Sequence, residues 1–123
     1  MSETINWNVS INVNNGPQLS NADALAVDGY DKLEIKVEAG KSADVTVGPG
    51  KWTGVSLLMI NPSAADAKLT YKSGAVTAAL DGTHLLVGAG AVSLLGTGDA
   101  TLEFDNGTAA DVSIEIVVGR SAS

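Results

Sequence analysis

The sequence predicts an all-β fold: an antiparallel β-sandwich, a jelly roll or a related Greek key, with roughly nine short strands. Several stretches alternate between apolar and polar residues, which is the period of a strand buried on one face. Turn-forming residues recur about every 8–12 residues, as in sandwiches and barrels. The chain is rich in Val, Thr, Ala and Asp and has 14 Gly, whereas long straight-chain helix formers are scarce. An immunoglobulin-like sandwich without its cysteine pair is the alternative.

Length and charge narrow the class of protein further. The 123 residues predict one domain, 1–123, without room for a second module. The chain has no cysteine, which excludes disulfides and thiolate metal sites. A net charge of -7 argues against nucleic acid and anionic membranes as partners. The first residues lack a basic and then apolar leader, so we expect no signal peptide and synthesis in the cytoplasm.

The N-terminal third supplies the clearest alternation. In residues 4–13, Ile5 and every second residue after it are apolar, while Asn and Ser fill the positions between them. Asn14 to Pro17 supply turn chemistry. A short strand is expected at 24–27. Residues 32–47 predict a hairpin, because two alternating stretches flank the turn at Ala39-Gly40-Lys41.

The remaining strands are expected between further turn signals. Gly48-Pro49-Gly50 breaks the chain, and Ser73-Gly74, Asp81-Gly82 and Asp105-Asn106-Gly107 predict turns, the last one a hairpin. The strands expected between them are 55–60, 67–73, 75–80, 84–87, 91–95, 100–104 and 111–118. Short helices are considered only around 20–26 and 63–67.

The stretch HLLVGAGAVSLLGTG, residues 84–98, raises the question of a nucleotide-binding loop. A dinucleotide loop needs Gly-x-Gly-x-x-Gly between a strand and a helix, but Ser93 holds the sixth position and Gly-Thr-Gly soon follows. No Gly-Lys-Ser/Thr is present for a P-loop. We therefore interpret the stretch as two strands joined by a tight glycine turn.

No catalytic or metal site is predicted, and neither an enzyme nor a cofactor is expected. His84 is the only histidine, so triads and zinc sites lack partners for it. The short loops at Asp28, Asp81 and Asp105 are rich in oxygen atoms, but none has the spaced carboxylates typical of a calcium loop. Asp-Gly and Asn-Gly are first of all turn residues.

Four aromatic residues are weighed as a sugar-stacking platform. Trp7 and Tyr71 lie on the apolar phase of their strands, which favours the core. Trp52 follows Gly-Pro-Gly-Lys near an expected loop tip, and Tyr30 lies in an Asp-containing loop. Trp52 and Tyr30 are therefore the ligand-binding residues of an alternative prediction, in which the domain binds carbohydrate or a cell surface.

Two stretches, 55–60 and 85–95, are apolar on both faces. A small sandwich has only one inner face, so a second apolar face needs a cover. A neighbouring subunit is the expected cover, which predicts a homo-oligomer of closed symmetry. The predicted contact residues are Val55, Leu57, Leu58, Ile60, Leu86, Val92, Leu94 and Leu95.

The segment LTYKSGAVTAALDGTHLLVGAGAVSLLGTGDATLEFDNGTAADVSIEIVVGR, residues 69–120, resembles small all-β virion proteins of tailed bacteriophages. The resemblance is one of general character, since such proteins are short, acidic, free of cysteine and rich in Gly, Ala, Thr and Val. It implies a non-enzymatic structural protein that decorates or cements a capsid or another large assembly, with virion localisation. By the same analogy the expected oligomer is a trimer.

Overall fold

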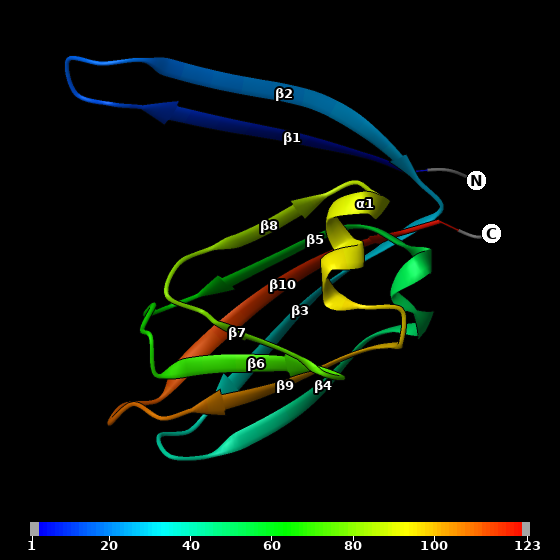
Figure 1. Cartoon of the computed structure of the whole chain (residues 1–123). Coiled ribbons are helices and arrows are strands. Elements are labelled where there is room, and N and C mark those ends of the chain that lie inside the picture. The colour runs from blue at the N-terminus through cyan, green and yellow to red at the C-terminus, as the bar shows by residue number, and fades with distance from the viewer. Residues whose placement is uncertain (1–2, 122–123) are drawn as a thin grey trace.

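The computed structural model describes residues 3–121 and consists mostly of antiparallel β-structure, as predicted (Figure 1). Strands hold 64% of the residues and helices 8%. The strands are β1 (Glu3–Asn12), β2 (Gln18–Val27), β3 (Gly29–Val37), β4 (Ser42–Lys51), β5 (Val55–Pro62), β6 (Leu69–Ser73), β7 (Val76–Ala79), β8 (His84–Val87), β9 (Asp99–Asn106) and β10 (Val112–Arg120).

Eight strands form two antiparallel four-stranded sheets. One has the order β3-β10-β5-β8 and is called here the β10 sheet. The other has the order β4-β9-β6-β7 and is called the β9 sheet. Alternate residues of a strand lie on the same face of its sheet. The buried apolar residues of both sheets belong to one core. Among the fully buried side chains are Leu58, Ile60, Leu69, Leu102, Phe104, Ile114 and Ile116.

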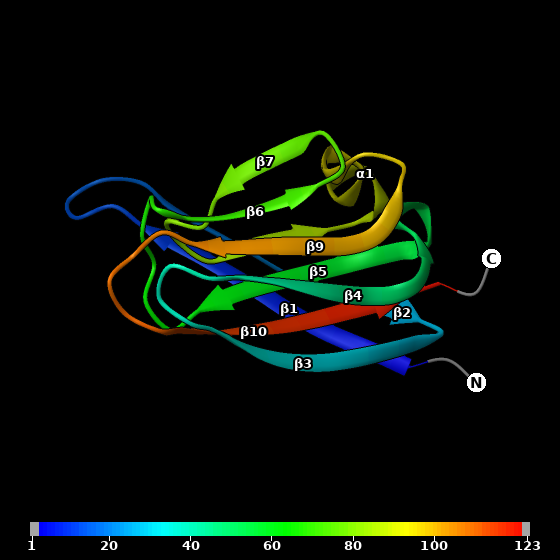
Figure 2. The same ribbon diagram turned by 90° about the horizontal axis from the view of Figure 1, so that it is seen from below.

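The remaining strands, β1 and β2, form a separate two-stranded sheet. The alternation in 4–13 predicted β1 well. β2 is much longer than the expected strand at 24–27, and it occupies the region where a short helix was considered. Figure 2 shows that β1 runs obliquely to the strands of the two sheets.

The predicted hairpins at 32–47 and around Asp105-Asn106-Gly107 are wrong. β3 pairs with β10, while β4 pairs with β9, so the turn between β3 and β4 leads from one sheet to the other. The connection from β9 to β10 also changes sheet. A polar turn that closes a hairpin and a polar turn that links two sheets have the same local chemistry. They differ only in whether the two flanking strands pair with each other. The turn at Ser73-Gly74 does close a hairpin, β6–β7, with Gly74 at φ 57°.

The strand expected at 91–95 is also wrong. Residues Ala89–Val92 form the short helix α1, and Ser93–Leu95 continue it as a 3₁₀ turn. Val92 and Leu95 are three residues apart and both buried, so helical spacing brings them to one face. Gly88 (φ 94°) and Gly96 (φ 98°) flank the helical segment in conformations that favour glycine. A second 3₁₀ turn covers Trp52–Gly54, and no helix lies at 63–67.

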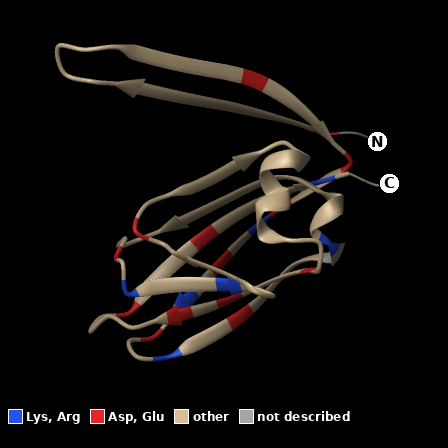
Figure 3. Ribbon diagram, viewed as in Figure 1, with Lys and Arg blue, Asp and Glu red and all other residues tan. Residues whose placement is uncertain are grey.

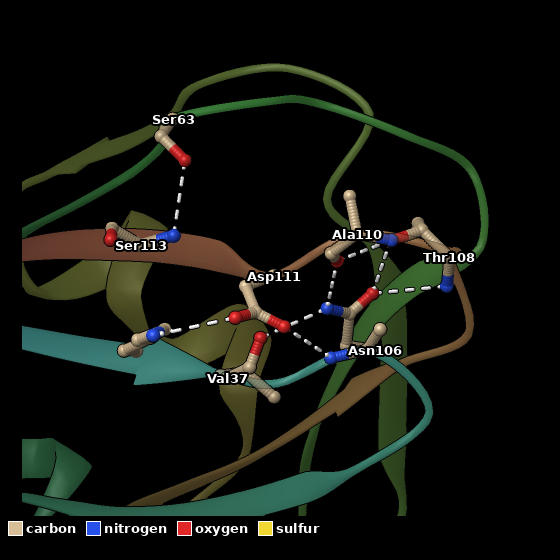
Figure 4. A network of polar contacts seen from close by, with 9 residues as sticks. Val37, Ser63, Asn106, Thr108, Ala110, Asp111 and Ser113 are labelled. Carbon is tan, nitrogen blue, oxygen red and sulfur yellow. Dashed lines mark hydrogen bonds and ion pairs between the residues drawn. The ribbon is translucent and has the colours of Figure 1, made fainter.

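The side chain of Asn106 connects the end of β3 to the loop between β9 and β10 (Figure 4). Its buried amide donates from Nδ2 to the carbonyl oxygens of Val37 (2.9 Å) and Ala110 (2.8 Å). Its Oδ1 accepts from the backbone N–H (3.0 Å) and the hydroxyl (2.6 Å) of Thr108. Its backbone N–H donates to the Lys41 carbonyl at 2.9 Å. One side chain therefore joins the end of β3 to the loop before β10.

Candidate interaction surface

Strands β1 and β2 build a ribbon, called here the arm (residues 3–27), that pairs with no other strand of the described chain. Its register places Ile5 opposite Leu25 and Ile11 opposite Leu19. Directly opposed residues of an antiparallel pair lie on the same face, and faces alternate along a strand. One face therefore carries the apolar residues of β1, while Asn, Ser, Thr, Gln and Ala fill the other face.

The base of the arm packs on the outer face of the β10 sheet. A Cβ built on Gly119 would lie 2.7 Å from Ile5 Cδ1 and 3.1 Å from Val27 Cγ1. Val27 is 2% exposed, and the neighbouring Leu57 is 3% exposed. The Asp28 N–H donates to the Arg120 carbonyl at 2.8 Å, which joins the end of the arm to β10. Gly119 thus leaves the space that the arm base occupies.

The burial of the apolar face decreases toward the tip of the arm. Ile5, Trp7 and Val9 are half-buried, whereas Ile11 is 54% exposed and Leu19 is 69% exposed. No Asp, Glu, Lys or Arg occurs between residues 4 and 22. In Figure 3 the part of the ribbon toward its tip carries no charged segment, whereas red acidic segments appear nearer its base and the body carries many charges. Exposed apolar residues on an uncharged projecting ribbon mark a candidate contact surface.

Sequence reasoning missed the contribution of β2 to this face. Leu19 and Leu25 lie on the apolar face, but Asn21 and Asp23 stand between them in the same phase. The other phase of β2 is filled by small residues, so its alternation is weak. The available signal was the turn at 14–17, since a turn after a clean strand predicts an antiparallel partner of similar length.

The outer face of the β10 sheet has an apolar half and a charged half. Cross-strand pairing places the apolar half on β5, β8 and the neighbouring part of β10: Leu57, Met59, Leu85, Val87, Val117 and Gly119. The other half follows β3, where Lys32 and Glu34 alternate with core residues and Lys32 Nζ lies 3.1 Å from Glu115 Oε2. Met59, Leu85 and Val117 are half-buried. Residues 4–22 of the arm and the β5 and β8 residues of this half therefore both lack charged side chains.

Most residues predicted to form the oligomer contact lie inside this single chain. Buried in the core are Val55, Leu58, Ile60, Val92 and Leu95, and Leu86 packs against that core. Leu57 is buried beside Gly119, where the arm base packs. At this point the second face of β5 is covered by a segment of the same chain, where a neighbouring subunit was the expected cover. Leu94 is 70% exposed and remains available.

The two residues of the sugar-binding alternative lie in different environments. Trp52 is 1% exposed, and its indole N–H donates to Ser73 Oγ at 2.6 Å, so its ring cannot stack on a ligand. Tyr30 is 56% exposed on β3. Tyr71 is buried as expected, and burial raises the pKa of its hydroxyl. Trp7, expected in the core, is instead half-buried on the arm.

His84 is half-buried at the start of β8, where it contacts Tyr71. Its Nδ1 lies 2.6 Å from the Tyr71 hydroxyl, and the two rings meet edge to face at a centroid distance of 5.4 Å. Asp28 and Asp81 lie in separate connections, and Asp105 lies in strand β9. Within residues 3–121, no three His, Asp or Glu side chains lie close enough together to hold a metal ion.

A cavity of about 560 Å³ lies at the end of the sheets near the chain termini. Its lining includes the glycine-rich end of β4 together with Lys51 and Arg120. The Arg120 guanidinium is held by Asp31, with Nη2 2.7 Å from Oδ2, and Nη1 lies 3.5 Å from the Val47 carbonyl oxygen. The cation is therefore engaged within the fold rather than directed at an open site.

No protein-family model, curated protein or solved structure matches the chain. Among the described residues, no helix is both long and apolar enough to cross a membrane.

Proposed function

We propose that this chain is a non-enzymatic structural protein of a virion: a homo-oligomeric decoration or cement protein that binds a capsid or another large assembly. The observation that carries the proposal is the arm. It is a ribbon of two ten-residue strands that pair only with each other, and it exposes Ile11 and Leu19 toward its tip. Because a hairpin alone is marginally stable in water, a long projecting ribbon is best explained by a surface that it contacts.

The strand order supports a jelly roll, which is common among capsid proteins. The chain changes sheet between β3 and β4, between β4 and β5, and between β5 and β6. The last two strands, β9 and β10, then enter the middle of their sheets between earlier strands. We propose that the two sheets form one jelly-roll sandwich with the arm as an N-terminal addition.

The mechanism is avidity. Identical copies present their arms to identical sites on a symmetric lattice, so modest contacts at each site multiply into stable attachment. Residues 4–22 of the arm are uncharged, so these contacts depend on apolar packing and on the exposed edges of the ribbon rather than on charge. A net charge of -7 on the whole chain keeps the free protein dispersed before it attaches.

The test is mass spectrometry of virus particles purified from the source whose genome encodes the chain. We expect its peptides at a fixed ratio to the major shell protein, because each copy occupies one lattice site. Particles with a complete shell but no peptides of this chain would overturn the proposal. Saturable binding on a glycan array, lost in Tyr30→Ala, would favour the carbohydrate-binding alternative instead.

A further inference from the structure

We infer that the distal part of the arm, residues 8–21, binds a second copy of this chain on the apolar half of the outer face of its β10 sheet. The inference rests on the oligomer in the proposed function and names the surfaces that form it. On the arm the contact is made by Ile11 and Leu19. On the receiving copy it is made by Met59, Leu85 and Val117.

The first argument is a repeated pair. Ile5 and Leu25 face each other across the arm, and so do Ile11 and Leu19 on the same face of the ribbon. Ile5 of the first pair already packs at Gly119 on the outer face of the β10 sheet, and its partner Leu25 is half-buried. The second pair has the same chemistry but remains exposed. A matching apolar surface for it exists on another copy of the same sheet.

The second argument is geometry. The two pairs are separated by six residues, or about 20 Å along a strand. The arm lies beside the β10 sheet at its base and diverges from it toward the tip (Figure 1). Ile11 and Leu19 therefore keep 54% and 69% of their surface exposed instead of packing on their own sheet. Ile11 and Leu19 are therefore accessible to a surface on another molecule.

The third argument is charge. Residues 4–22 carry none, and β5 and β8, which hold Met59 and Leu85, contain no Asp, Glu, Lys or Arg. Val117 of β10 lies at the edge of this surface, because it pairs with Lys32 of β3 and stands two residues from Glu115. Nucleic acid or an anionic membrane would select basic residues, which the arm lacks. Lys and Pro are among the residues that protect exposed strand edges; Pro17 lies in the turn at the tip, but the strand residues 8–12 and 18–21 contain neither. A neutral apolar surface of a second copy fits these properties best.

The absence of cysteine allows a direct experiment. Leu19→Cys and Leu85→Cys are made as separate variants, mixed at equal concentration and oxidised. We expect a crosslinked dimer that contains one copy of each variant. Ser20→Cys is the matched control, because Ser20 lies next to Leu19 but on the opposite face of the arm. We expect it to give little crosslink with Leu85→Cys.

Crosslinking of Ser20→Cys as efficiently as Leu19→Cys would overturn the inference, because it would indicate random collision. The double variant Leu19→Cys/Leu85→Cys tests for a contact within one chain. A crosslinked product at monomer mass would mean that the arm folds back on its own sheet. That result would also overturn the inference.

Sedimentation of uncrosslinked protein supplies the second measurement. We expect Ile11→Asp/Leu19→Asp to raise the dissociation constant of the oligomer by about tenfold or more. Ser10→Asp/Ser20→Asp, a directly opposed pair on the other face, is the control expected to leave it unchanged. A wild-type chain that stays monomeric at all concentrations overturns the inference, while particle mass spectrometry still tests the virion role independently.

Discussion

Asn106 shows how much of this fold depends on one buried polar side chain. Each polar atom of its amide has a partner, and these partners come from β3 and from the loop that precedes β10. A buried amide that bonds to separate segments fixes how those segments lie relative to one another, because any unmatched donor or acceptor is costly.

Asn106→Asp tests this role. The variant preserves the volume but replaces the amide donor with a carboxylate that faces the carbonyl oxygens of Val37 and Ala110. We expect the free energy of unfolding to fall by about 3 kcal/mol or more, measured by urea denaturation. Asn12→Asp, at an exposed position of β1, is the control and is expected to change it by less than about 0.5 kcal/mol. Equal effects of the two changes would contradict the role of Asn106.

Asp111 leads to a prediction that depends on pH. The backbone N–H of Ala39 and the side chain of Lys36 lower the pKa of its carboxyl below the ordinary value of 3.8. The stabilisation is therefore fully present above that ordinary pKa and is lost as pH falls through the lowered, folded-state pKa. We expect Asp111→Asn to be less stable than wild type at neutral pH and to approach it below pH 3.8. The measurement is thermal unfolding of both proteins across this range, and a difference independent of pH would contradict the prediction.

Among the elements, the packing of the arm on the β10 sheet depends on Gly119, because this residue of β10 has no side chain. β10 is central in its sheet, and its outward position 119 lies beside Leu57 and beneath the arm base. Any side chain there would compete with Ile5 and Val27 for the same space. A glycine inside a strand usually weakens it, so its presence here is explained by the close approach of another element.

Gly119→Ala is expected to lower the free energy of unfolding by about 1 kcal/mol, because the new Cβ crowds Ile5 and Val27. Ile5→Ala removes the nearest atom, so the double variant is expected to lose less stability than the sum of the single changes. We expect the coupling in a double-mutant cycle to be about 0.5 kcal/mol or more. Gly29→Ala, where a Cβ meets nothing within 4 Å, is the control. Additive effects at positions 5 and 119 would contradict the packing of the arm base at Gly119.

At the scale of the whole molecule, charge and apolar surface are separated. The body carries exposed ion pairs such as Lys32–Glu115 and Lys36–Asp111 on one half of the β10 sheet. The other half of that outer face and the distal arm are uncharged. Exposed ion pairs stabilise little by themselves, but a charged surface resists nonspecific contact. This distribution leaves a limited region where apolar association is favourable, which agrees with the oligomer that we propose.

The sequence alone determined the all-β class and the strands whose alternation is clean, such as β1 and β10. It also predicted the turn at Ser73-Gly74. These features are local, because a side-chain period of two and the φ of a turn residue are set by neighbours along the chain. The sequence also indicated that β5 needs a cover on its second face.

The tertiary structure alone decided which strands pair and what covers them. The turn after β3 resembles a hairpin turn, but burying both sheets in one core sends β4 to the other sheet. Val92 and Leu95 form a helical turn because both reach that core from one face. The cover beside Leu57 is the base of the arm, from the far end of the sequence. Such choices depend on contacts between distant segments, and the local pattern of residues contains no information about which segment becomes the partner.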